Sequence, residues 1–146
     1  MKDVLNQLQI TVVPPMVLDV VWPQASTMLG RALNTTRARY NLDSLRAELE
    51  RGTLALWLVL DNATPVAAFT TRVAAYPESK GLCMDWIGGA RMAEWLPLAQ
   101  PLMEQYARDN GCTHLEGYGR RAWGRWLQKY GWEPEYIAYR MELTDG

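Results

Sequence analysis

The sequence predicts one α/β domain with a single mixed central β-sheet flanked by helices on both faces. Its 146 residues are 49% hydrophobic, which is the size and apolar content of one ordinary domain. Some segments repeat apolar residues at helical spacing, whereas others alternate or run together as strands do. The two kinds of segment interleave, as in a layered α/β architecture. No linker or repeat divides the chain, so residues 1–146 are expected to form one domain.

The first half of the chain predicts a strand followed by two helices. Residues 8–13 alternate and are partly β-branched, and two prolines then end this edge strand because proline cannot extend a ladder. Residues 18–33 repeat apolar side chains at helical spacing. Residues 42–50 predict a second helix, with Asp43 or Ser44 available as its N-cap.

The second half predicts five further strands and two helices. We expect the strands at 54–60, 66–76, 82–87, 112–118 and 132–143, and the helices at 94–110 and within 119–132. The first two of these strands flank a compact Asn-Ala-Thr-Pro turn and predict a hairpin. The helix at 94–110 ends before Gly111, a common helix stop.

Composition and charge narrow the possible functions. A net charge of −1 gives no global attraction to nucleic acid or to anionic membrane. No apolar run is long enough for a signal peptide or a membrane span, so we expect a cytoplasmic protein. Cys83 and Cys112 lack partners at metal-ligand spacing and are expected to be small buried hydrophobes. His114 likewise has no recognisable partner for a catalytic triad or a metal, so no metal is expected.

Residues 93–132 resemble the second half of proteins of the GNAT superfamily of N-acetyltransferases. Their sequence is "AEWLPLAQPLMEQYARDNGCTHLEGYGRRAWGRWLQKYGW". Within this run, Ala107-x-x-x-Gly111 and Lys129-x-Gly131-Trp132 fall at the intervals of that family. The order of elements extends the resemblance to nearly the whole chain. The resemblance implies the GNAT fold, acetyl-CoA as cofactor and transfer of its acetyl group to an amine.

The resemblance also implies a cofactor loop, from which this chain departs. Active members open the helix after the fourth strand with Arg/Gln-x-x-Gly-x-Gly/Ala, whose backbone N–H groups bind pyrophosphate at the helix N-terminus. Arg91 occupies the first position, but Glu94 and Leu96 occupy the positions of the small residues. A carboxylate repels phosphate, and leucine adds bulk where the backbone should be bare. Gly88-Gly89-Ala90 is the alternative loop, although a Gly-Gly pair is more often only a turn.

If acetyl-CoA binds, backbone amides of one continuous segment are expected to line it. The segment consists of Ile87, Gly88, Gly89, Ala90, Arg91 and Met92.

The catalytic acid of the family has no direct counterpart. Leu127 stands where many members place the tyrosine that protonates the departing thiolate, and Tyr130 lies elsewhere around the helix. Arg120 and Trp123 replace the asparagine and the alanine often found at the preceding strand-to-helix junction. Three departures from the family pattern within one motif favour a protein that has been repurposed for another role.

Other residues remain as candidates for the chemistry. Asp85 or Glu116 could act as a general base, although carboxylates that alternate on strands more often face solvent. Tyr118 could donate a proton from a different direction, or could be an aromatic rim residue. If the protein is an enzyme, we expect Asp85 and Tyr118 to matter most.

The first half of the chain favours a different role. "VWPQASTMLGRALNTT" and "YNLDSLRAELERGTLALWLVL" resemble GNAT-like open reading frames of tailed phages and prophages, often among virion genes. The leading hypothesis is therefore a repurposed GNAT-like structural or interaction component, cytoplasmic or virion-associated, with weak or absent acetyl transfer. It would bind protein partners or self-associate through tryptophans such as Trp95 or Trp123. The alternative is an acetyl-CoA-dependent N-acyltransferase acting on an unknown amine.

A third class is nucleic-acid binding through the basic residues around the last helix. These residues are Arg120, Arg121, Arg125 and Lys129. Helical spacing places the neighbouring aromatic residues on one face and the cations mainly on the other, as in any amphipathic surface helix. We therefore expect a solvated helix face and no nucleic-acid partner.

Overall fold

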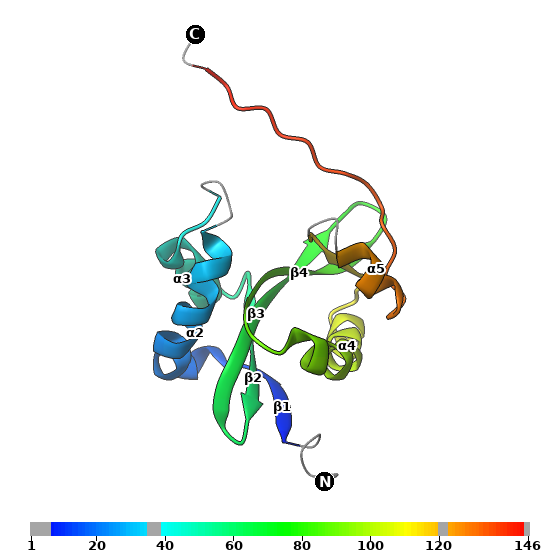
Figure 1. Ribbon diagram of the computed structural model, residues 1–146. Coiled ribbons are helices and arrows are strands. Elements are labelled where there is room, and N and C mark those ends of the chain that lie inside the picture. Colours follow the sequence, from blue (N-terminus) through cyan, green and yellow to red (C-terminus); the bar gives the residue numbers. More distant parts are fainter. Residues whose placement is uncertain (1–6, 35–38, 120–122, 145–146) are drawn as a thin grey trace.

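The computed structural model describes residues 7–34, 39–119 and 123–144 and has one five-stranded sheet at its centre (Figure 1). The strands lie in the order β1-β2-β3-β4-β5, with antiparallel pairing from β1 to β4 and parallel pairing between β4 and β5. They span Leu8–Val12, Ala55–Asp61, Thr64–Ala75, Lys80–Gly89 and His114–Gly117. The predicted mixed sheet is confirmed, with β1 at one edge.

Helices cover both faces of this sheet (Figure 1). The helices are α2 (Leu18–Leu33), α3 (Leu42–Arg51), α4 (Met92–Asp109) and α5 (Trp123–Gln128), and a short 3-10 turn, η1 (Pro15–Val17), precedes α2. Side chains of α2 and α3 form one apolar core with one face of the sheet. Side chains of α4 and α5 form a second core on the opposite face. The predicted fold class is therefore confirmed.

The N-terminus of α3 uses a different cap from the one expected. Asn41 is the N-cap, and its side chain accepts a hydrogen bond from the backbone N–H of Ser44 at 2.8 Å. Ser44 reciprocates, because its hydroxyl accepts a hydrogen bond from the backbone N–H of Asn41 at 3.0 Å. Neither Asp43 nor Ser44 is the cap, since the helix begins at Leu42 and both residues lie inside its first turn. Gly52 ends the helix in the left-handed conformation at φ 82°.

Trp95 lies in the core of the molecule, contrary to the expected role in partner binding. Its side chain is 0% exposed and stacks on Phe69 of β3 with 5.2 Å between ring centroids. Its indole N–H donates a hydrogen bond to the carbonyl of Ala90 at 3.1 Å. The apolar face of α4 points to the sheet at this position, so Trp95 anchors the helix and is not available to a partner.

The last predicted strand is absent. Residues 132–144 form no helix or strand, and Figure 1 shows this part of the chain running away from the body of the molecule. A strand needs a neighbour to satisfy its backbone groups, and this segment pairs with no strand of the described part of the chain. The prediction of a strand was wrong because alternation in a sequence cannot supply the neighbouring strand with which the segment would pair.

The last helix is short and amphipathic, as expected. Trp126 and Leu127 of α5 pack against the core on the α4 side of the sheet, and Trp126 contacts Tyr130 edge to face. Arg125 and Lys129 are exposed. Arg120 and Arg121 of the predicted cation group lie outside the described residues. The cations that the structure describes thus form a solvated surface, as expected.

Candidate functional site

A cleft opens where β4 and β5 separate. The two strands pair from Gly81 with His114 as far as Met84 with Gly117, and β5 ends there. Beyond this point β5 no longer satisfies the backbone groups along that side of β4. From residue 85 on, that side of β4 pairs with no strand of the described residues.

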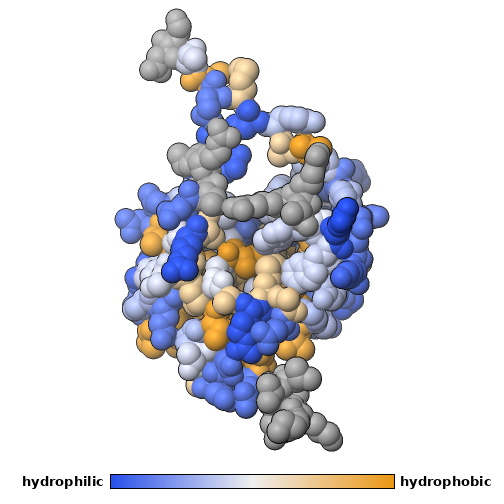
Figure 2. Space-filling model, viewed as in Figure 1, coloured by the Kyte–Doolittle hydropathy of each residue, from blue (hydrophilic) through white to orange (hydrophobic). Residues whose placement is uncertain are grey.

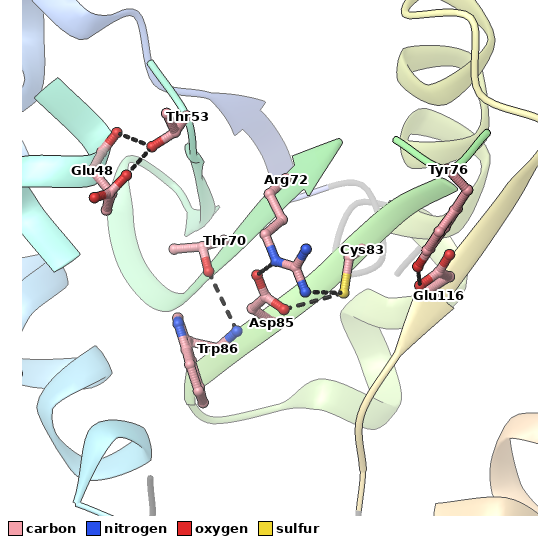
Figure 3. Close-up of polar contacts among 9 residues, drawn as sticks. All are labelled: Glu48, Thr53, Thr70, Arg72, Tyr76, Cys83, Asp85, Trp86 and Glu116. Carbon is pink, nitrogen blue, oxygen red and sulfur yellow. Dashed lines mark hydrogen bonds and ion pairs between the residues drawn. The ribbon is translucent and has the colours of Figure 1, made fainter. Parts of the chain in front are cut away.

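A β-bulge lies at the point of divergence. Phe69 of β3 pairs with Ile87 and Thr71 pairs with Met84, so β4 has one residue more than β3 across this interval. The backbone N–H of Trp86 donates to the Thr70 hydroxyl at 3.3 Å (Figure 3). A bulge of this kind bends the strand that carries the extra residue.

Apolar side chains narrow the cleft to a cavity of about 50 Å³. They come from β4, from α4 and α5, and from the segment after β5. The lining residues are Met84, Ile87, Met92, Leu96, Gly117, Tyr118, Gly119, Trp123, Leu127 and Trp132. Small-molecule sites usually enclose about 300–1,000 Å³, so a cofactor would enter only if lining side chains moved. Ile87, Met92 and Tyr118, all predicted site residues, meet here.

The Gly88-Gly89 pair has a packing role in this structure. Both residues belong to β4, paired with Ala68 and Ala67 of β3. A Cβ atom on Gly88 would lie 2.1 Å from the carbonyl oxygen of Met28, so the glycine permits close approach of α2 to the sheet. Gly89 has φ 104° and also admits no side chain, because a Cβ there would meet backbone atoms of β3.

Ala90 and Arg91 connect β4 to α4. The backbone N–H of Ala90 donates to the carbonyl of Val66 at 3.0 Å. Arg91 is the N-cap residue of α4, in the left-handed conformation at φ 66°. The first N–H groups of a helix have no partner within the helix and attract anions, so this end of α4 has the geometry of a phosphate site.

Carboxylates beside this helix end oppose that attraction. The Arg91 guanidinium pairs with Asp61 at 2.6 Å and with Glu94 at 2.9 Å. Hydrogen bonding to Arg91 lowers the pKa of Glu94, so that carboxylate stays ionised at neutral pH. The same bonds, to Glu94 first and then to Asp61, raise the pKa of Arg91. Two carboxylates against one guanidinium leave one net negative charge next to the N-terminus of α4.

Tyr118 reaches the cavity from the end of β5, and Leu127 reaches it from α5. A hydrogen bond with Tyr136, followed by burial, raises the pKa of Tyr118 to about 12. Its hydroxyl is therefore protonated at neutral pH and is able to donate a hydrogen bond. Of the two predicted catalytic residues, Tyr118 is the one that lines the cavity.

Asp85 is already bound to other side chains. Its carboxylate accepts hydrogen bonds from Nε of Arg72 at 2.8 Å and from Sγ of Cys83 at 3.1 Å (Figure 3). Burial, and then the charge of Asp85, raise the pKa of the Cys83 thiol. Cys83 and Cys112 are both free and buried, as the sequence predicted. The sequence did not indicate Arg72, because ion pairs between neighbouring strands depend on register.

Glu116 of β5 pairs with Cys83 of β4 and lies beside this group (Figure 3). It accepts a hydrogen bond from the Tyr76 hydroxyl at 2.8 Å and contacts Nε2 of His114 at 2.7 Å. The Glu116 hydrogen bond, more than burial, raises the pKa of Tyr76 to about 12. The expectation that His114 lacks a carboxylate partner was wrong. Residues two apart on a strand share a face, and that spacing was the available signal.

The described residues were also searched for membrane-spanning helices and for metal-binding groups. No helix among them is long and apolar enough to cross a membrane. No group of three or more His, Cys, Asp or Glu side chains there is placed to hold a metal ion.

Comparison with known proteins identifies the fold. No protein-family model matches the sequence, and a search of curated proteins gives no match. Among solved structures, an aminoglycoside acetyltransferase, meta-AAC0020, from an uncultured soil metagenomic sample and in complex with sisomicin, has a TM-score of 0.66 at 12% identity, over 95% of this chain and 98% of its own.

Two other acetyltransferase structures are similar to the same extent. A structure described as a probable acetyltransferase has a TM-score of 0.70 at 12% identity, over 94% of this chain and 99% of its own. The aminoglycoside N-acetyltransferase AAC(6')-Iy in complex with CoA has a TM-score of 0.68 at 12% identity, over 93% of this chain and 95% of its own. With the mixed sheet, the flanking helices and the separation of β4 from β5, these likenesses show that the chain has the GNAT fold of the acyl-CoA N-acyltransferases.

Proposed function

We propose that the protein binds an acyl-CoA thioester in the cleft between β4 and β5 and transfers the acyl group to an amine, with residues 1–146 acting as one domain. The observation that carries this proposal is the end of β4–β5 pairing at Met84 and Gly117, with the bulge of β4 at the same place. The similar structure AAC(6')-Iy is in complex with CoA. Backbone amides of residues 87–92, other than that of Ala90, which donates to Val66, would line the cofactor, and the N-terminus of α4 would face its phosphates.

Direct transfer needs few groups from the protein. The amine, once it has lost one proton to solvent, attacks the thioester carbonyl and forms a carbon–nitrogen bond. The nitrogen of the tetrahedral intermediate then loses a second proton to solvent. Collapse of the tetrahedral intermediate breaks the carbon–sulfur bond, and the departing thiolate takes a proton from the Tyr118 hydroxyl. The resulting phenolate then regains a proton from solvent. Tyr118 lines the cavity and is protonated at neutral pH, so its hydroxyl has a proton to donate. Its raised pKa makes it a weaker acid than an ordinary tyrosine, so this transfer is the demanding step.

Titration with acetyl-CoA tests the proposal. We expect calorimetry to detect micromolar binding, and acetyl-CoA at about 100 times its Kd to stabilise the fold by about 2.7 kcal/mol.

Tyr118→Phe should retain binding but lower the rate of acetyl transfer to a panel of primary amines by about 100-fold. Tyr139→Phe is the matched control, because Tyr139 is fully outside the cleft and should leave the rate unchanged. Absence of binding at millimolar acetyl-CoA would contradict the proposal.

The charge beside α4 gives a second test. Glu94→Gln removes the carboxylate from the first turn of α4 while preserving the size of the side chain. We expect acetyl-CoA to bind about 2- to 5-fold more tightly to this variant, because one negative charge near a helix N-terminus changes the energy of a bound anion by about 0.3–1 kcal/mol. Glu104→Gln, on the same helix but far from its N-terminus, should not change the affinity. Equal affinities of Glu94→Gln and the unchanged protein would place the phosphates elsewhere.

A second candidate is a repurposed GNAT-fold protein that acts through protein contacts with weak or absent acetyl transfer. The net negative charge beside α4 and the small volume of the cavity favour it. A setting in a phage virion rests on the sequence resemblance alone, and a setting in the cytoplasm stays an expectation from composition. The same calorimetry distinguishes the two candidates, since an interaction component should show no acetyl-CoA binding and should self-associate or retain a partner.

A further inference from the structure

Glu116 lies at the point where β5 leaves β4, on the face of the sheet opposite to the cofactor cavity. It pairs with Cys83, one residue before the last β4–β5 pair. Its neighbours face the α4 side, because Leu115 packs against that core and Gly117 lines the cavity. Side chains alternate along a strand, so Glu116 projects on the side of α2 and α3. Its carboxylate and the cavity therefore lie on the two faces of one position in the sheet.

The charge of Glu116 has no permanently cationic partner. Its side chain is 11% exposed, and its two oxygens are bound by the Tyr76 hydroxyl at 2.8 Å and by Nε2 of His114 at 2.7 Å. Tyr76 is neutral, since the bond to Glu116 raises its pKa to about 12, and His114 is charged only when protonated. No lysine or arginine of the described residues forms an ion pair with Glu116. A largely buried carboxylate without such a partner is costly, and a bound cation would remove that cost.

Asp85, the other carboxylate beside this group, has its charge balanced. Its side chain is 9% exposed and pairs with the Arg72 guanidinium at 2.8 Å (Figure 3). The Cys83 thiol donates a further hydrogen bond to it at 3.1 Å. Of the two carboxylates that the sequence offers as a general base, Glu116 is thus the one whose charge the protein leaves unbalanced.

Solvent reaches Glu116 past its two partners. His114 and Tyr76 are both exposed, so the carboxylate is one side chain away from bulk water. Residues 137–143 stand away from the body of the molecule (Figure 2), and Tyr139 among them is 89% exposed. This segment of the chain therefore leaves the carboxylate open to an acceptor.

A proton donor lies next to this carboxylate. Tyr118 lines the cavity two residues after Glu116. A hydrogen bond with Tyr136 and burial do most to raise the pKa of Tyr118, and the charge of Glu116 adds to them. The two groups therefore interact where the strands diverge. A protonated hydroxyl beside an ionised carboxylate is the arrangement that a general acid and a general base need.

We propose that Glu116 is the general base that takes a proton from the acceptor amine, an inference that rests on the proposed acyl transfer. A protonated primary amine pairs with the carboxylate on the α2–α3 face of the sheet. Its N–H bond breaks as an O–H bond forms on Glu116, and the neutral amine then attacks the thioester between the diverging strands. Glu116 returns the proton to solvent past His114, so solvent remains the final acceptor. Tyr76 and His114 are positioning residues, because each holds one carboxylate oxygen.

Two acceptors that differ in protonation test this role. The first is the fastest primary alkylamine of the panel, which is protonated at neutral pH, and the second is methoxyamine, which is not. Glu116→Gln should lower the rate of acetyl transfer to the alkylamine by about 100-fold but to methoxyamine by less than about 3-fold, because methoxyamine needs no base before it attacks. The variant should bind acetyl-CoA as the unchanged protein does, and its transfer to methoxyamine shows in the same sample that it is folded.

Further variants complete the test. Glu78→Gln is the matched control, because this carboxylate is exposed between β3 and β4 and both rates should stay unchanged. Glu116→Asp keeps the charge but withdraws it from its partners, so it should lose about 10-fold with the alkylamine and serves if Glu116→Gln does not fold. His114→Ala should slow transfer to the alkylamine alone, and His114→Gln, whose amide can still donate to Glu116, should restore most of that rate.

Three results would contradict the role of Glu116. Equal losses with the two amines would assign the residue a structural role and overturn the proposal. An alkylamine rate that Glu116→Gln leaves unchanged would overturn it as well. Failure of the proposed function is distinct, because the unchanged protein would then transfer acetyl to neither amine, and that result overturns both.

Discussion

Replacing Trp95 with alanine is expected to lower the free energy of unfolding by about 3–5 kcal/mol, the range for loss of a large aromatic side chain from a core. The indole ring is 0% exposed and stacks on Phe69, which itself stacks on Trp57. Removing the ring leaves a cavity at the centre of the α4 core and leaves the carbonyl of Ala90 without its indole partner. Urea denaturation followed by circular dichroism measures the change.

Two companion variants separate the causes of that loss. Trp95→Phe retains most of the stacking surface but loses the hydrogen bond to Ala90, so a large part of the stability should return, with about 1 kcal/mol still missing from the bond. Met16→Ala should change the stability by less than about 0.5 kcal/mol, because Met16 is exposed. If Trp95→Ala were no more harmful than Met16→Ala, α4 would not be anchored as the structure shows.

Gly88→Ala is expected to lower the free energy of unfolding by at least about 2 kcal/mol, because it overpacks a contact between two backbones. The new Cβ would lie 2.1 Å from the carbonyl oxygen of Met28 and 2.5 Å from its carbonyl carbon. Neither atom belongs to a flexible side chain, so α2 would have to move away from β4. The same denaturation measurement, without any ligand, detects the effect.

Gly124→Ala is the matched control for Gly88→Ala. A Cβ on Gly124 would meet no atom within 4 Å, and the residue lies inside α5. Alanine favours a helix over glycine by about 1 kcal/mol, so this variant should be neutral or slightly stabilising. Unchanged stability of Gly88→Ala would mean that α2 lies farther from the sheet, and the glycine would then need another explanation, such as close approach of a cofactor.

Local patterns predicted most of the elements. The periodicity of Leu18–Leu33 predicted α2 with the bounds it has, and the turn at 62–65 predicted the β2–β3 hairpin. These features depend on the interactions of residues near one another in the chain, which a sequence contains directly. The order of such elements was then sufficient to predict a mixed sheet between two helical layers.

Long-range partners could not be predicted in this way. Alternation at 132–143 indicated a strand, but whether that strand pairs depends on a sheet edge supplied from elsewhere. Three contacts depend on elements that are distant in sequence. They are the burial of Trp95 against the sheet, the contact of Gly88 with Met28, and the ion pair of Asp85 with Arg72. A pattern along the chain carries no information about which of several apolar or charged residues will meet.

In the candidate site, too, some features were predictable from local patterns and others depended on long-range contacts. Patterns along the chain predicted the fold class, the place of Leu127 in the family motif and the residues that follow β4. The folded chain was needed to show that β5 leaves β4 at Gly117 and that Tyr118 reaches the cavity. It was also needed to show that Asp85 pairs with Arg72, and that Arg91 pairs with Asp61 and Glu94. The physical reason is that secondary structure follows from local periodicity, whereas a site follows from register, packing and charge between strands that only the folded chain brings together.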